Sequence, residues 1–291
     1  MNAVRPPSSP SAFPAAAPEA SDALPSGPLS AESSSSSVHP ASERPTSARP
    51  AKTDGLDVRI TQKRFVSADG TDMLAIDDIA FTAPEGSFTA LIGPSGCGKT
   101  TTLRVILGID TDFSGHIRRA DPEGRIAAVF QEPRLLPWRS VETNVRLALP
   151  PERRGDDLGP LFETLGLSDM AGRYPGELSL GLARRVALAR AFAIRPALLL
   201  LDEPFVSLDE QTAARLRALL LDVWSARPTT ALLVTHNLRE AVELADRIVF
   251  LTERPARVRG VYDLLTPRAE RTPAWREQTV GVIDALYPGV L

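Results

Sequence analysis

The sequence predicts an α/β fold with a mostly parallel sheet. Short apolar runs, typical of strands covered on both faces, lie at 88–92, 125–130, 197–201, 230–235 and 247–252. Helical spacing of apolar residues lies between the later runs, at 210–224 and 238–244. A glycine-rich loop joins the first run to another helical pattern, which ends near Gly108. Strands and helices that alternate in this way form α/β sheets.

Two segments ahead of the glycine-rich loop predict an antiparallel β edge. Residues 58–65 and 76–83 read as strands, and the turn signal at 67–70 separates them.

The segment between the second and third apolar runs predicts a helical insertion. From 131 to 194 strand patterns are absent, and proline-punctuated helical patterns appear at 141–149, 158–165 and 181–194. A further proline-bounded helix is predicted at 275–286, with no chemistry assigned to it.

Composition predicts how these segments are grouped. Residues 1–50 contain ten Pro and thirteen Ser and almost no large apolar side chains, which is typical of a disordered segment. We therefore expect a disordered tail at 1–55, a nucleotide-binding domain at 56–262 with a helical subdomain at about 132–194, and an extension at 263–291.

Charge and cysteine content exclude several classes of protein. The 33 basic and 36 acidic residues nearly balance, so no basic excess favours a nucleic-acid partner. The single cysteine excludes an intramolecular disulfide and suits a reducing compartment. The longest uninterrupted apolar run after residue 56, at 197–201, is far shorter than the roughly 20 residues that span a bilayer. No secretory signal is expected. These features favour a cytoplasmic protein.

The glycine-rich loop predicts a polyphosphate site. It reads Gly93, Pro94, Ser95, Gly96, Cys97, Gly98, Lys99, Thr100 and Thr101. In a G-x-x-x-x-G-K-[ST] loop between strand and helix, backbone N–H groups surround the phosphates, Lys99 reaches the β- and γ-phosphates, and the Thr100 hydroxyl binds Mg²⁺. The loop predicts ATP or GTP as the ligand. The helix N-terminus beside it also predicts a lowered thiol pKa for Cys97.

Polar residues follow three of the apolar runs. Asp202 and Glu203 end the run at 198–201, His236 follows 231–235, and Gln131 follows 126–130. The carboxyl edge of an open α/β sheet is where ligands bind. Asp202 is therefore expected to hold Mg²⁺ opposite Thr100, and Glu203 to polarise the water that attacks the γ-phosphate. An isolated acidic turn would more often be only a solvated surface feature, but here a phosphate loop precedes it.

At this point the sequence resembles the nucleotide-binding subunits of ATP-binding cassette (ABC) transporters, over about residues 56–262. The motifs occur in the family's order: the first nucleotide motif at 93–100, the Q-loop at Gln131, the signature at 178–182, the second nucleotide motif at 198–203, the D-loop at 207–209 and the switch histidine at His236. Phe65 occupies the position of the aromatic residue that stacks on adenine. The resemblance implies a P-loop NTPase core of the ABC ATPase type.

The resemblance also implies a mechanism. Glu203, His236 and Gln131 take catalytic roles, and Thr100, Gln131 and Asp202 bind Mg²⁺ beside ATP. A second cassette, expected to be an identical chain, faces the first, so Ser179, Gly181 and Asp209 contribute to a shared nucleotide site.

This chain departs from the family at two positions of the signature. Leu180 replaces a usual glycine, and Leu182 replaces a commonly polar residue. A leucine at position 180 is expected either to resist the backbone angles that glycine tolerates, and so weaken closure of the dimer, or simply to point away.

Residues 131–139 resemble the Q-loop of importers for nitrate, aliphatic sulfonates and taurine. Leu135, Leu136 and Trp138 predict an apolar patch on the 132–139 loop that contacts membrane permease subunits, although the same residues could instead pack the insertion onto the core. The resemblance implies a peripheral protein on the cytoplasmic face of the inner or plasma membrane, served indirectly by a periplasmic or extracellular solute-binding protein.

Three alternatives stay open at this stage. The chain could serve an importer for another solute class, such as a thiamine precursor. A soluble ABC ATPase acting on nucleic acid is disfavoured, because only 80 positions separate Lys99 from Ser179 and the chain has a single cassette. A P-loop kinase would leave the signature and His236 unexplained.

Overall fold

The computed structural model describes residues 54–66 and 70–289. The predicted tail therefore lies outside the described residues except at its last two positions, as does most of the predicted turn at 67–70. Within the described residues, no helix has both the length and the apolar character needed to cross a membrane.

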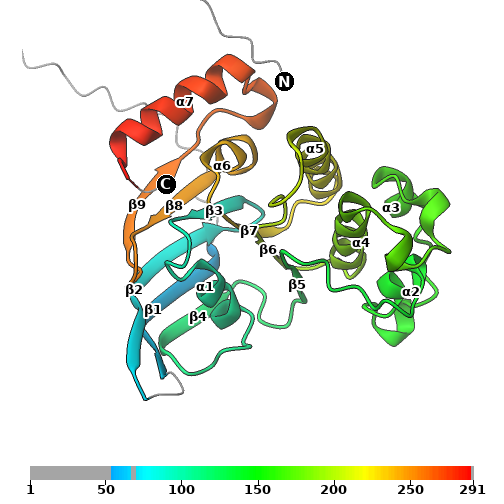
Figure 1. The fold of residues 1–291 in the computed structure, drawn as a ribbon, viewed down its shortest axis with the longest axis horizontal. Helices are drawn as coiled ribbons and strands as arrows, with labels where there is room; N and C mark the ends of the chain where they lie inside the picture. The colour runs from blue at the N-terminus through cyan, green and yellow to red at the C-terminus, as the bar shows by residue number, and fades with distance from the viewer. Residues whose placement is uncertain (1–53, 67–69, 290–291) are drawn as a thin grey trace, which may run out of the picture. The chain divides into compact units, whose positions relative to one another are not determined.

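Two sheets form the core of the fold (Figure 1). A six-stranded sheet has the order β5 (Ile126–Val129), β6 (Leu198–Asp202), β7 (Thr230–Thr235), β3 (Phe88–Ile92), β8 (Arg247–Leu251) and β9 (Val258–Asp263). Its first five strands pair in parallel, and β9 pairs antiparallel with β8. A three-stranded antiparallel sheet has the order β2 (Asp72–Pro84), β1 (Asp54–Val66) and β4 (Ser114–Arg119). The predicted α/β class, mostly parallel with an antiparallel edge, is confirmed.

Seven α-helices accompany the sheets in the described part of the chain: α1 (Lys99–Ile106), α2 (Val141–Arg146), α3 (Gly159–Thr164), α4 (Leu180–Ala193), α5 (Glu210–Ala226), α6 (Leu238–Leu244) and α7 (Pro273–Leu286). Short 3₁₀ turns occur at Pro151–Arg153, Ser168–Met170, Pro175–Glu177 and Arg268–Glu270. Each predicted helical span overlaps one of these α-helices, with ends that differ by up to two or three residues.

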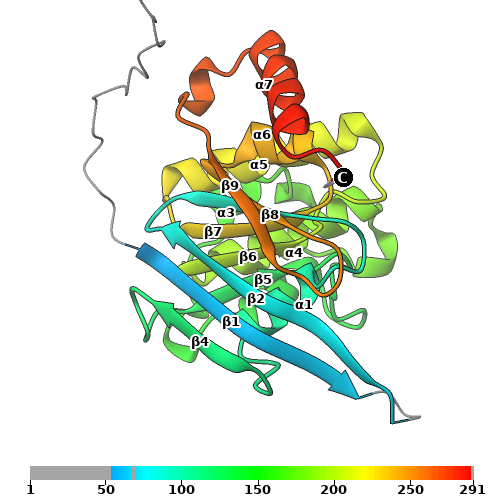
Figure 2. The same cartoon turned by 90° about the vertical axis from the view of Figure 1, so that its left-hand side faces the viewer.

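Apolar side chains pack on both faces of the six-stranded sheet. On one face, a buried cluster joins the three-stranded sheet and α1 to the larger sheet, and Figure 2 shows the smaller sheet in front of it. On the other face, one cluster joins the sheet to α5 and the helices of the 141–193 region, and another joins it to α6 and α7. The strands β3, β6 and β7 are buried at every residue, as their continuous apolar runs predicted.

Two strands were not predicted from the sequence. β4 and β9 lie at sheet edges, and their residues are exposed or half-buried, so neither shows a continuous apolar run. Edge strands of this kind owe their structure to pairing with a neighbour.

Candidate functional site

The site lies where three parallel strands end at the same edge of the sheet. Ile92, the last residue of β3, pairs with Thr235 of β7, and Val234 of β7 pairs with Asp202 of β6. The segments that follow these strands therefore begin side by side. This register brings together the phosphate loop, the two carboxylates and His236, as the sequence predicted for the carboxyl edge.

Two glycines of the phosphate loop occupy positions that disfavour a side chain, one through its backbone angle and one through close packing. Gly98, just before α1, has φ 124°, which L side chains rarely adopt. A Cβ atom at Gly93 would lie 2.9 Å from the Cys97 sulfur and 3.0 Å from the Leu251 Cβ. The loop is thus closely packed against β8 and turns directly into the helix.

Lys99 is buried at the start of α1, and its side chain folds back over the loop. Its ammonium group donates hydrogen bonds to the carbonyl oxygens of Gly93 at 2.7 Å and Pro94 at 2.9 Å. It also lies 3.9 Å from Glu203 Oε1. A cation is therefore held above the loop, where the sequence predicts the phosphates.

Thr100 and Asp202 meet across the loop. The Thr100 hydroxyl donates to Asp202 Oδ1 at 3.1 Å. Burial raises the pKa of the Asp202 carboxyl, and the Thr100 hydrogen bond works in the opposite direction. A bound cation would favour the ionised form of this carboxyl. Hydroxyl and carboxylate oxygens are the ligands that Mg²⁺ prefers, so this pair fits the predicted metal.

Glu203 lies between Lys99 and His236. Its Oε2 is 3.3 Å from His236 Nδ1, and the Glu203 side chain is 20% exposed while that of His236 is 50% exposed. Its backbone has φ 45°, in the left-handed region, and its N–H donates to the Val234 carbonyl at 2.9 Å. The carboxylate can therefore accept a proton beside a cation and an imidazole.

Gln131 does not join this cluster in the structure. Its side chain is exposed and makes no hydrogen bond within the described residues, while its carbonyl oxygen accepts a 3.5 Å bond from Arg184. Its predicted catalytic and metal-binding roles stay predictions.

The loop after Gln131 is held by two side chains of the helical region. Arg190 of α4 donates to the carbonyl oxygens of Pro133 and Arg134, each at 2.8 Å. Asn144 of α2 accepts from the Leu136 N–H, and its amide nitrogen donates to the carbonyl oxygens of Leu136, Arg139 and Ser140. Leu135 packs against the core, whereas Trp138 is 67% exposed. Of the predicted apolar patch, Trp138 is the most exposed member.

The signature residues form the N-terminus of α4. The Ser179 hydroxyl accepts from Leu182 N–H at 3.3 Å, so Ser179 caps the helix. Gly181 is buried, and a Cβ there would lie 2.9 Å from the Thr212 methyl of α5. Leu180 is 42% exposed and is not among the residues with positive φ. Of the two alternatives for Leu180, strain from glycine-like backbone angles is not supported, because a helical residue needs no glycine conformation. Its effect on closure of the dimer stays a prediction.

Asp209 and Phe65 lie at the ends of other elements. Asp209 caps α5 by accepting from Thr212 N–H at 2.9 Å, and this bond is part of what lowers the pKa of its carboxyl. Phe65, near the end of β1, has the Lys63 ammonium 4.8 Å from its ring centroid. Their predicted nucleotide contacts stay predictions.

The prediction of a lowered thiol pKa for Cys97 was wrong. The side chain is 1% exposed, and burial raises its pKa, outweighing the nearby Lys99 cation. The thiol faces Gly93 rather than the solvent side of the loop.

Sequence reasoning missed one contact to the phosphate loop. The Arg254 guanidinium donates to the Gly96 carbonyl at 2.6 Å, and it also contacts the Met73 sulfur. Arg254 lies after β8, far along the chain, and no spacing rule connects it with the loop. The position of the Arg254 cation beside the predicted phosphate site becomes visible only when the fold is known.

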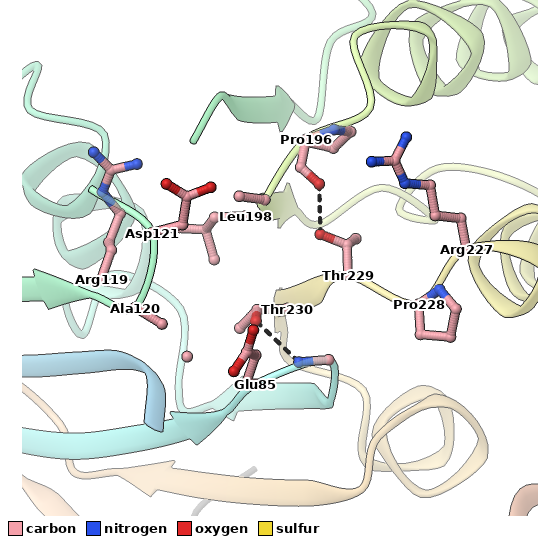
Figure 3. Close-up of a pocket in the computed structure, with 13 residues that line it drawn as sticks. Glu85, Arg119, Ala120, Asp121, Pro196, Leu198, Arg227, Pro228, Thr229 and Thr230 are labelled. Carbon is pink, nitrogen blue, oxygen red and sulfur yellow. Dashed lines mark hydrogen bonds between the residues drawn. The ribbon is translucent and has the colours of Figure 1, made fainter. Parts of the chain in front are cut away.

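Two of the cavities lie at opposite ends of the strands of the six-stranded sheet. A cavity of about 180 Å³ is lined by Glu203, Ser207, His236 and Glu240 among others, next to the carboxylates. A larger cavity, about 370 Å³, lies where β6 and β7 begin, and Figure 3 shows Arg119, Asp121 and Arg227 around it. None of the predicted site residues lines the larger cavity.

Comparisons with known proteins agree with this geometry. Residues 76–206 match the family model described as ABC transporter. The chain is 41% identical over 239 residues to the aliphatic sulfonates import ATP-binding protein SsuB 2 of Burkholderia cenocepacia, covering 79% of this chain and 86% of the relative. It is 37% identical over 245 residues to the SsuB protein of Bacillus cereus, covering 81% and 97%.

Solved structures show the same fold. The dimeric ATP-binding cassette MJ0796, in a post-hydrolysis state bound to ADP and phosphate, superposes with a TM-score of 0.62 at 25% identity, covering 73% of this chain and 100% of the cassette. CbiO1 of Clostridium perfringens, part of an ABC transporter complex, gives 0.62 at 22% identity, covering 81% and 96%.

Proposed function

Because the chain belongs to the ABC transporter family of ATP-binding proteins, we propose that it hydrolyses ATP to drive the import of aliphatic sulfonates or a similar small solute, such as nitrate or taurine. The names of the relatives support sulfonates within this group. The amino-acid sequence of the 131–139 loop supports the wider group of nitrate, aliphatic sulfonate and taurine importers.

One observation carries the hydrolytic part of the proposal: Lys99, Thr100, Asp202, Glu203 and His236 converge at one sheet edge. Lys99 binds the β- and γ-phosphates of ATP. Glu203 accepts a proton from the water that attacks the γ-phosphorus, while the bond from this phosphorus to the ADP oxygen breaks. His236, whose ring lies 3.3 Å from Glu203, contacts the γ-phosphate in this proposal.

Thr100 and Asp202 are the residues that hold Mg²⁺ in this proposal, with Gln131 as a third ligand. Bound Mg²⁺ offsets negative charge on the phosphate oxygens. Gln131 is exposed and reaches the metal only if the loop that begins there moves.

Two cassettes share the nucleotide sites in the proposed complex. Ser179 and Gly181 lie at the start of α4, a helix of 14 residues whose N-terminus has free N–H groups and a positive dipole end. In the proposed dimer this terminus contacts the γ-phosphate held by the phosphate loop of a second, identical copy. The dimeric state of the structurally similar cassette supports this arrangement.

The proposed contact with the membrane permease is the 132–139 loop. Trp138 is exposed on a loop whose main chain Arg190 and Asn144 hold in place, so an apolar anchor is presented on a fixed support. The protein would then lie on the cytoplasmic face of the membrane. A solute-binding protein on the other side supplies the solute to the permease.

Reconstitution in liposomes tests the proposal. The chain is purified with its membrane permease, and ATP hydrolysis is measured with the cognate solute-binding protein and one solute at a time. We expect an alkanesulfonate to stimulate hydrolysis, and Glu203→Gln to abolish it. Stimulation by a thiamine precursor and not by sulfonate, nitrate or taurine would refute the solute class, whereas hydrolysis stimulated by nucleic acid would refute import.

A further inference from the structure

The turn that carries His236 is tied on both sides to one buried carboxylate. Glu240, in the first turn of α6, is 9% exposed. Its Oε2 accepts from the Thr235 hydroxyl at 2.6 Å, and its Oε1 accepts from Asn237 Nδ2 at 3.3 Å. Thr235 and Asn237 are the two chain neighbours of His236.

A third hydrogen bond closes this arrangement. Asn237 N–H donates to the Thr235 hydroxyl oxygen at 3.0 Å, so that hydroxyl accepts from one side of the turn and donates to Glu240. Asn237 Oδ1 also accepts from Arg239 N–H at 2.9 Å and caps α6. The backbone on both sides of His236 is therefore fixed by hydrogen bonds that do not involve the imidazole.

His236 itself has little else to hold it. Its side chain is 50% exposed, and within the described residues its one polar contact is the 3.3 Å approach to Glu203. The cavity of about 180 Å³ beside it is lined by Glu203, His236 and Glu240, so no side chain fills the space on that side of the turn. Without Glu240, the turn would have room to move.

We propose that Glu240 is a positioning residue for ATP hydrolysis, which holds His236 in place by binding Thr235 and Asn237. This inference rests on the proposed role of His236 at the γ-phosphate. Glu240 does not contact the phosphate in this account and acts only through the turn. A displacement of about 1 Å in a group that must meet a reacting atom is enough to lower a rate by up to about a hundredfold.

The charge around Glu240 suits this role. Burial raises the pKa of its carboxyl, while the Thr235 hydroxyl, the Arg217 and His236 charges and Asn237 favour its ionised form. Both carboxylate oxygens of Glu240 accept a hydrogen bond from the turn, Oε2 from the Thr235 hydroxyl and Oε1 from the Asn237 amide.

The same helix provides a matched control. Glu243 lies one turn further along α6, and its oxygens contact Arg217 at 2.7 Å and Arg276 at 3.3 Å. These arginines lie on α5 and α7 and not on the turn that carries His236, so removing Glu243 costs ion pairs of α6 without releasing the turn.

Steady-state kinetics of the full chain test the inference. For Glu240→Ala we expect kcat to fall by about tenfold to a hundredfold, with KM and the dissociation constant for ATP within about twofold of the parent. Thr235→Val, which removes the shared hydroxyl at similar volume, should show the same split. Glu240→Gln keeps an acceptor for Thr235 and should recover part of kcat, and Glu243→Ala should keep the parental kcat.

Proton NMR of the imidazoles gives a second readout. The chain has three histidines, so the His236 signal is assigned from the His236→Ala spectrum. In Glu240→Ala we expect this signal to broaden or to move toward the position of a solvated histidine, and in Glu243→Ala to stay unchanged.

The outcomes separate the two claims. If His236→Ala hydrolyses ATP at the parental rate, the proposed role of His236 is wrong. If His236→Ala is slow while Glu240→Ala and Thr235→Val keep the parental kcat and NMR signal, the role of His236 stands and the positioning role of Glu240 is overturned.

Discussion

At the scale of single residues, the backbone around the carboxylates is unusual. Glu203 has φ 45° and Ser207 has φ 61°, and neither is glycine. Such conformations cost about 1–3 kcal/mol each and persist where the surroundings determine them. Glu203 is held by its N–H bond to Val234 and by its position between Lys99 and His236. The conformation places its carboxylate at the sheet edge instead of continuing the strand.

Cys97 should react slowly with alkylating reagents. Its thiol is buried and its pKa is raised, so near neutral pH both access and the thiolate fraction are low. Because access and the thiolate fraction are both reduced, we expect alkylation by a maleimide to be at least about tenfold slower than that of a solvated thiol. Mass spectrometry over time measures the rate, which should rise with pH.

Ser95 provides the control for this experiment, because it is exposed in the same loop. Ser95→Cys in a Cys97→Ala background should react at the rate of a solvated thiol, and bound Mg-ATP should protect it. Rapid labelling of the parent chain at Cys97 would contradict the buried position of the thiol.

At the scale of elements, predictability followed burial. Strands β3, β6 and β7 are buried throughout, so their apolar runs were visible in the sequence. β4 and β9 lie at edges, and their exposed residues gave no such run. Pairing with β1 and β8 decides these strands, and a pairing partner is not visible in a local pattern.

The residues of the site also differ in how far the sequence predicts them. Lys99, Asp202 and His236 were predictable because each follows a strand or opens a helix at a fixed offset. Arg254 and Glu240 were not, because their partners are reached only through the folded chain or through the shape of a turn. The pKa of Cys97 was mispredicted because proximity to a helix terminus is visible in the sequence and burial of one thiol is not.

The C-terminus of α4 offers a stabilising substitution. Arg195 follows the last turn of this helix with φ 50°, and its side chain is exposed. Glycine adopts this conformation without the steric cost of a Cβ atom. Arg195→Gly should raise the free energy of unfolding by about 0.5–1 kcal/mol, measured by urea denaturation.

Arg195→Ala is the matched control, since alanine keeps the Cβ atom and removes the charge. It should change stability by less than the glycine variant. A loss of stability in Arg195→Gly would mean that the arginine side chain, and not the backbone, matters at this position.

At the scale of the whole molecule, the C-terminal segment contributes to stability. Helix α7 is part of the packed core: Ile283 is buried, and the rings of Tyr287 and Phe250 stack at 4.3 Å. The buried Arg271 ties the segment before α7 to α6 by donating to the carbonyl oxygens of Val242 and Ala245. Residues 1–50 lie outside the described residues, and their composition predicts that they add nothing to this core.

Truncation should therefore affect the ends unequally. Deleting residues 1–50 should leave Tm and ATP affinity unchanged, as checked by calorimetry and titration. Deleting residues 273–291 should lower the free energy of unfolding by at least about 3 kcal/mol, because Ile283 and Tyr287 no longer cover the core. A drop in Tm of several degrees on removing residues 1–50 would show that this segment stabilises the cassette.

The central claim is that Glu203 activates water at a site where Lys99 binds the phosphates of ATP. The most direct measurement is the fate of ATP bound to Glu203→Gln, followed by sedimentation and by analysis of the bound nucleotide, with Lys99→Ala as the variant that binds ATP poorly. We expect Glu203→Gln to retain unhydrolysed ATP within a dimer of two chains. Hydrolysis by this variant at the parental rate would contradict the account.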